Sequence, residues 1–214
     1  MGVNGLATTL LVAAGLAAVA DWWAVGTGRR KLEWIAKPLT MVLLIGVALA
    51  LDPATPAVRG WFVVALLFSL VGDVFLMMER EQFILGLASF LVAHLAYIVG
   101  LVVTGLTLVA ALFGVGAAVG GIMLIGRRIQ RAAARSDPRL APPVLAYMVV
   151  ISIMLAAAIA TTNLPAVAGA CFFYASDGIL GWNRFVAPIR GGRVMIMATY
   201  HLAQALLVVA LVSL

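Results

Sequence analysis

The stretch GWFVVALLFSLVGDVFLMM at residues 60–78 decides the class of fold. It is long enough to cross a bilayer as a helix, because roughly 20 apolar residues span about 30 Å of hydrocarbon. Its single charged side chain is Asp73. A carboxylate near the centre of a membrane helix costs about 2.5 to 3.5 kcal/mol, so it is expected to face a protein interior or a water-filled cavity. The stretch therefore predicts a membrane helix that carries an acidic group into a helix bundle.

Apolar runs of similar length recur along the whole chain. Of the 214 residues, 65% are hydrophobic and 10% are charged, whereas soluble domains are about half apolar and a quarter charged. The sequence predicts an all-α, polytopic membrane protein in which residues 1–214 form a single transmembrane domain. The eight expected helices cover residues 4–25, 32–51, 59–78, 82–103, 105–126, 141–161, 165–183 and 193–213.

The basic residues indicate the orientation of these helices. Thirteen of the fourteen Lys and Arg residues, including Lys37 and Arg80, fall on one side of the predicted topology. Cytoplasmic loops carry an excess of such residues, so we expect both termini outside and a multi-pass protein of the inner (plasma) membrane. The largest polar connection, RRIQRAAARSDPR at residues 127–139, is expected to be a loop that fixes this topology. The net charge of +6 is thus assigned to insertion and to contact with anionic membrane lipids, not to nucleic acid.

Polar residues within the predicted helices form stripes. Ser69 and Asp73 are four residues apart, as are Tyr200 and Gln204, so each pair shares one helix face. At about 1.5 Å per residue, the stripes lie at depths that allow one cavity, open to the cytoplasmic side, to contain them. The residues assigned to this cavity are Ser69, Asp73, His94, Tyr97, Tyr174, Ser176, Asp177, Tyr200, His201 and Gln204, with Lys37 at the head of the helix expected over 32–51.

Most of these residues also have a purely structural interpretation. A His or Tyr between membrane helices commonly does no more than hydrogen-bond a neighbouring helix. Basic residues at helix ends, such as Arg184 and Arg193, commonly extend to lipid head groups. Asp73 and Asp177 fit this interpretation poorly, because a neutral residue would join helices at lower cost.

Two carboxylates on one cavity can serve as an acid and a base. A pair that shares one proton can donate it from one carboxyl while the other activates water, so hydrolysis needs no nucleophilic Ser or Cys. Two alternatives stay open. One is a zinc-dependent hydrolase with a site built from both histidines and a carboxylate, and the other is a proton-coupled transporter with an Asp and His relay. Transporters often have helices broken at the midplane, whereas all eight prolines are expected in loops or near helix ends.

Several motifs occur in a fixed order along the chain: Lys37-Pro38, GDVFLM at 72–77, FILGLASFLVAHLAYI at 83–98, FYASDGILGWNRF at 173–185 and YHLAQALL at 200–207. Together they resemble the YhhN family, the lysoplasmalogenases. The resemblance implies an eight-helix membrane protein that takes a lysophospholipid from the bilayer. It implies hydrolysis of the vinyl ether bond of lysoplasmenylethanolamine or lysoplasmenylcholine to a fatty aldehyde and a glycerophospho-alcohol. We expect neither a cofactor nor a metal.

The same resemblance implies roles for individual residues. Asp73 and Asp177 correspond to the family's two essential aspartates, and our hypothesis gives Asp177 the role of acid and Asp73 that of base. Lys37 and Arg184 are expected to bind the substrate phosphate. The other expected substrate-binding residues are Ser69, His94, Ser176, Asn183, Tyr200, His201 and Gln204.

Overall fold

The computed structural model describes residues 4–53, 55–78 and 82–214, so Arg80 and its part in the orientation pattern lie outside the described residues. Every regular element in this part of the chain is helical. Within the described residues, eight helices are long and apolar enough to cross a membrane, which confirms the predicted all-α membrane fold. The first four are α1 (Gly5–Thr27), α2 (Arg30–Ala50), α3 (Pro56–Met77) and α4 (Phe83–Val103).

The second half of the chain has one irregular span. Here α5 (Leu108–Gly121) passes through a π-helical turn, η1 (Ile122–Gly126), into α6 (Arg127–Ser136), and together they form the fifth span. A short 3-10 turn, η2 (Pro138–Leu140), leads into the sixth. The last three helices are α7 (Ala141–Ala160), α8 (Leu164–Phe185) and α9 (Gly192–Ala210).

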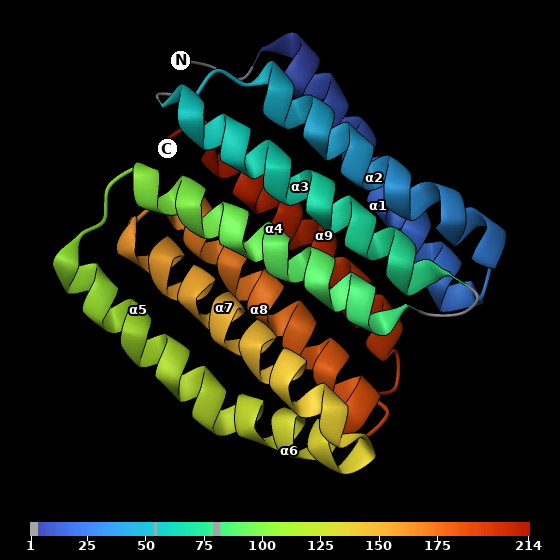
Figure 1. Cartoon of the computed structure of the whole chain (residues 1–214). Coiled ribbons are helices and arrows are strands. Elements are labelled where there is room, and N and C mark those ends of the chain that lie inside the picture. Colours follow the sequence, from blue (N-terminus) through green and yellow to red (C-terminus); the bar gives the residue numbers. More distant parts are fainter. Residues whose placement is uncertain (1–3, 54, 79–81) are drawn as a thin grey trace.

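The helices lie side by side in one bundle (Figure 1). The consecutive pairs α1–α2, α3–α4 and α8–α9 pack against each other, and α9 also contacts α1 and α2. On the other side, α4 packs on α7, which contacts both α5 and α8. The start of α1 and the end of α9 lie at one end of the bundle, whereas α6 and the α8–α9 connection lie at the opposite end (Figure 1).

The segment predicted as a loop over residues 127–139 is largely helical, which corrects that prediction. Residues 127–136 form α6. No Pro or Gly interrupts them, and their Arg, Gln and Ala residues are strong helix formers. Ile129 and Ala133, one turn apart, are buried, while the arginines of α6 are exposed. The segment therefore covers the bundle with an apolar stripe and presents its charge outward.

Lys37 and Pro38 lie deeper in their helix than predicted. Because α2 begins at Arg30, Pro38 is inside the helix, and the expectation that every proline lies in a loop or near a helix end is wrong for it. The helix nevertheless continues to Ala50. Lys37 is only 4% exposed, so it belongs to the bundle interior and not to the basic residues of the connections.

Candidate functional site

Asp73 is held by residues from two other helices. It is buried on α3, and its Oδ1 lies 3.0 Å from the Nζ of Lys37 on α2. The hydroxyl of Tyr200, on α9, donates a hydrogen bond of 2.7 Å to Oδ2. Leaving either partner of a buried ion pair without the other costs about 3 to 5 kcal/mol, so the pair stabilises both charges. Three helices thus meet at a carboxylate that has a lysine ammonium as its partner.

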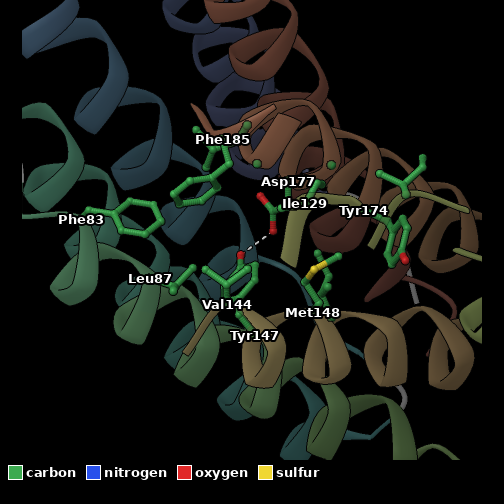
Figure 2. A pocket seen from close by; sticks show the side chains of 14 residues that line it. Phe83, Leu87, Ile129, Val144, Tyr147, Met148, Tyr174, Asp177 and Phe185 are labelled. Atoms are coloured by element: carbon green, nitrogen blue, oxygen red, sulfur yellow. Dashed lines mark hydrogen bonds between the residues drawn. The ribbon is translucent and has the colours of Figure 1, made fainter. Parts of the chain in front are cut away.

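Asp177, on α8, has uncharged partners. The hydroxyl of Tyr147, on α7, donates a hydrogen bond to Oδ2 (Figure 2), and Nε2 of His94, on α4, lies 3.7 Å from the same oxygen. The other ring nitrogen of His94, Nδ1, lies 2.5 Å from the carbonyl oxygen of Phe90. Because a carbonyl can only accept, Nδ1 carries a hydrogen, and a neutral His94 ring presents an unprotonated Nε2. Among the described residues, a phenol and an imidazole, both uncharged, thus lie beside the Asp177 carboxylate.

Both aspartates line one cavity of about 320 Å³, here called the polar cavity. Phe90 and Leu180 form part of its wall near the aspartates. At its polar end, Nη2 of Arg193 binds both carboxylate oxygens of Glu33, at 2.7 and 3.0 Å. The other polar lining residues are Lys37, Ser176, Asn183, Arg184 and Tyr200.

Asp177 also borders a second, narrow space of about 50 Å³, here called the crevice. Figure 2 shows the Asp177 carboxylate facing Tyr147, with Phe83 and Phe185 to one side and Tyr174 to the other. Leu180 lines both spaces. Apart from the hydroxyl groups of Tyr147 and Tyr174, the rest of the crevice lining is apolar. It includes Leu87, Ile125, Ile129, Val144, Met148 and Ile151. Asp177 therefore stands between a polar space and an apolar one.

The structure brings most of the sequence-predicted residues together, but not all. Lys37, Asp73, Ser176, Asp177, Asn183, Arg184 and Tyr200 line the polar cavity, and His94 approaches Asp177. Gln204 lies outside this lining and accepts a hydrogen bond of 2.5 Å from the hydroxyl of Tyr97. Ser69 is buried on α3, and its hydroxyl has no hydrogen-bond partner in the part of the chain that the structure describes. The helices therefore do not form one cavity that contains all of the predicted polar residues.

His201 belongs to a different part of the bundle. The Nε1–H of Trp22 donates a hydrogen bond of 3.1 Å to its Nδ1, and its ring lines an apolar space with Thr40 and Leu44. The zinc alternative requires His94 and His201 at one ion. Among residues 4–53, 55–78 and 82–214, no three His, Cys, Asp or Glu side chains are grouped so that they could hold a metal.

Sequence reasoning missed three residues of interest. Tyr147 lies in an apolar run where a single tyrosine carries no distinct signal. Glu33 lies at the very start of the helix expected over 32–51, next to Arg29, Arg30 and Lys31, where an acid carries no distinct signal. Asp21, near the end of α1, is fully buried, and neither of its carboxylate oxygens has a hydrogen-bond partner in the described part of the chain. An acid so close to an expected helix end gives no sign of such burial.

Comparison with known proteins identifies the family. Human lysoplasmalogenase TMEM86B is 30% identical over 188 residues, which cover 83% of this chain and 75% of that protein. The lysoplasmalogenase of Mycobacterium tuberculosis is 30% identical over 197 residues, covering 85% and 70%, and human lysoplasmalogenase TMEM86A is 32% identical over 165 residues, covering 70% and 64%. No solved structure matches the chain. The sequence profile of the YhhN family matches residues 32–211, a range that contains both aspartates, and the chain therefore belongs to the YhhN family.

Proposed function

We propose that the protein is an intramembrane hydrolase that cleaves the vinyl ether bond of lysoplasmalogens to a fatty aldehyde and a glycerophospho-alcohol. Membership of the YhhN family and relatives named lysoplasmalogenase support this proposal. The observation that carries the proposed reaction is the unequal pair of aspartates on one cavity. Asp73 has a cationic partner and stays charged, whereas Asp177 has uncharged partners and can hold a proton.

In this mechanism Asp177 starts the reaction as the acid. Its proton goes to the vinyl carbon beta to the ether oxygen, and the π electrons of the double bond form the new C–H bond. The adjacent carbon and oxygen then share the positive charge of an oxocarbenium ion. Two carboxylates on the same cavity stabilise this charge, and fixed charges placed where charge develops are usually the largest catalytic effect. The Tyr147 hydroxyl stabilises the carboxylate that Asp177 becomes.

Asp73 acts in the second half as the base. It accepts a proton from water as the water oxygen bonds to the oxocarbenium carbon, which gives a hemiacetal. The hemiacetal hydroxyl then gives its proton to Asp177, and its C–O bond to glycerol breaks. Asp73 returns its proton to the departing glycerol oxygen. Both carboxyls regain their starting states, and the cycle consumes one water molecule.

The polar end of the cavity suits a phospholipid head group. Lys37 was expected to bind the substrate phosphate together with Arg184, but it is paired with Asp73. In this proposal Arg193 takes the place of Lys37, so that Arg184 and Arg193 bind the phosphate. Arg193 is 63% exposed on its side chain and lies against Glu33. A guanidinium and a carboxylate side by side complement a head group that carries a phosphate and an ammonium, since each charge finds its opposite.

The test is release of aldehyde by the purified protein in detergent. Lysoplasmenylethanolamine is compared with its saturated ether analogue, with and without EDTA, and we expect aldehyde from the vinyl ether alone at a rate that EDTA does not change. In D₂O, with immediate reduction by borohydride, the product should carry one deuterium on the carbon next to the former carbonyl carbon. That carbon is the one that the mechanism protonates.

Substitutions at the aspartates complete the test. Asp73→Asn and Asp177→Asn should each abolish turnover, because the amide can neither donate an acidic proton nor accept one from water. Asp137→Asn is the matched control, since Asp137 is exposed beyond α6. A fully active Asp73→Asn or Asp177→Asn variant, or a product without the deuterium, contradicts the mechanism.

A further inference from the structure

Three spaces follow α8, each shares lining residues with the next, and together they are here called the path. The polar cavity and the crevice share Asp177 and Leu180. The crevice in turn shares Ile125, Tyr174 and Gly178 with an apolar groove of about 480 Å³. The other residues that line this groove include Leu155, Cys171 and Trp182. Cys171 and Ile125 are exposed, so the groove opens on the lipid-facing surface of the bundle.

The packing of the fifth span explains why this side of α8 is open. α5 packs on α7, whereas contact with α8 comes from α6, beyond the π-helical turn η1. Between these contacts Tyr174 extends from α8 to the end of α5, where its hydroxyl leaves no room for a Cβ at Gly121. The groove lies beside this crossing, next to Ile125 of η1. π-Helical turns occur frequently at functional sites.

We propose that the hydrocarbon chain of the substrate occupies this path and enters it from the bilayer between η1 and α8. This inference rests on the proposed function, because a vinyl ether joins a hydrocarbon chain directly to the glycerol carrying the head group. With the head group in the polar cavity and the chain in the groove, the vinyl ether lies at Asp177. The crevice, about 50 Å³, is much smaller than the groove, about 480 Å³. It therefore holds the first carbons of the chain, and the groove holds the rest.

Gly178 keeps the path open between the crevice and the groove. It borders both spaces, and a Cβ added there would meet no atom within 4 Å. Gly181, three residues later, differs because a Cβ there would lie 3.0 Å from Ile129. A side chain introduced at position 178 thus enters the path itself, whereas one at position 181 presses on α6.

The test uses two substrates that share a head group and a vinyl ether but carry a hexadecenyl or a butenyl chain. The measured quantity is the ratio of kcat/KM for the long chain to that for the short chain. Ile125→Trp should lower this ratio by about tenfold or more, since filling an apolar pocket discriminates on that scale. Leu124→Trp is the matched control: Leu124 is the neighbour of Ile125 on η1, is 73% exposed and lines neither space.

A second pair of variants tests the same path from α8. Gly178→Leu should also lower the ratio by about tenfold or more. Its control is Gly116→Leu on α5, where an added Cβ likewise meets no atom within 4 Å but which lines none of the three spaces. Because Gly178 adjoins Asp177, the Ile125→Trp result decides the question if the Gly178→Leu protein does not fold.

The outcomes separate this inference from the proposed function. A wild-type protein that releases aldehyde, together with an unchanged ratio in the Ile125→Trp and Gly178→Leu variants, overturns the path and leaves the hydrolase intact. An equal fall of the ratio in Leu124→Trp overturns it as well. A wild-type protein that releases aldehyde from neither substrate refutes the hydrolase itself and the path with it.

Discussion

The ammonium of Lys37 and the carboxylate of Asp73 form a buried ion pair at the centre of the bundle. Lys37→Met should leave the carboxylate without its cation and destabilise the fold by about 3 to 5 kcal/mol. The double variant Lys37→Met/Asp73→Asn removes both charges and should regain most of that loss. It should nevertheless release no aldehyde, because it lacks the base. Thermal unfolding in detergent, followed together with aldehyde release, measures both effects.

Lys31→Met, at an exposed position of α2, provides the control for Lys37→Met. Its unfolding temperature should match that of the wild type. If Lys37→Met is as stable as Lys31→Met, then the ion pair contributes nothing to the fold, and the argument for an ionised Asp73 loses its basis.

Tyr147 acts on the reaction through Asp177. Tyr147→Phe removes the hydroxyl that donates to the Asp177 carboxylate. A hydrogen bond to a charged group contributes about 1.5 to 3 kcal/mol, so kcat should fall by roughly ten- to a hundredfold with little change in KM. Tyr97→Phe is the control, since Tyr97 is also buried but bonds Gln204, and neither residue lines the polar cavity. A kcat that falls equally in both variants would assign Tyr147 a structural role only.

Arg193 determines substrate binding in our proposal, not chemistry. Arg193→Gln should raise KM for lysoplasmenylethanolamine by about tenfold, which corresponds to one charge-assisted hydrogen bond of about 1.4 kcal/mol. The substitution also leaves the charge of Glu33 uncompensated beside the phosphate, which adds to the rise in KM. For an alkenylglycerol that carries no phosphate, KM should not respond to Arg193→Gln. An equal change for both substrates argues against phosphate binding by Arg193.

At the scale of helices, the contact between α5 and α7 depends on a glycine. A Cβ at Gly114 would lie 2.6 Å from the carbonyl oxygen of Ala156 and 2.9 Å from its Cα, and backbone atoms cannot rotate away. Gly114→Ala should therefore destabilise the protein by about 1 to 3 kcal/mol. Gly116→Ala, two residues later with open space around it, should keep or slightly raise the unfolding temperature, because Ala favours helix by about 1 kcal/mol over Gly. Equal stability of the two variants would contradict the close approach of α5 to α7.

The positions of the spanning helices could be predicted because each needs a long apolar run, which is a local property of the sequence. The segment that forms α6 was predicted as a loop because its arginines resemble a polar connection, although its residues favour a helix. The burial of Ile129 and Ala133 depends on the positions of α7 and α8. Local propensity therefore indicates that α6 is helical, but only packing between distant helices shows that it covers the bundle.

The same distinction applies to the candidate site. Asp73 and Asp177 are recognisable one at a time, since each interrupts an apolar run. Their partners depend on how each helix is rotated. Tyr200 and His201 are adjacent, yet successive residues of a helix point about 100° apart. Tyr200 consequently reaches Asp73 while His201 reaches Trp22, a division that sequence spacing alone did not show.

For the whole molecule, the charge asymmetry predicts the side of the membrane on which the polar cavity opens. Glu33 and Arg193 lie near the start of α2 and of α9, at the end of the bundle opposite the termini. With both termini outside, the head-group end faces the cytoplasm. In a bacterial host, a C-terminal alkaline phosphatase fusion should be active and a C-terminal green fluorescent protein fusion dark. The reverse pattern would place the head-group end outside.

The π-helical turn Ile122–Gly126 also restricts where single residues can be inserted into the chain or deleted from it. Each α-helical residue advances about 100° around the axis. A π-helical turn, with its i→i+5 hydrogen bonds, holds one residue more than the α-helical path that it replaces. Deleting one residue within the turn would therefore let the span continue as an α-helix with α6 facing nearly the same way. The same deletion in α6 ahead of Ile129 would instead rotate the following residues by about 100°, so that Ile129 and Ala133 leave the bundle surface and arginines move toward it. Among relatives, single-residue deletions in this span should therefore fall within residues 122–126 and be rare over residues 127–133.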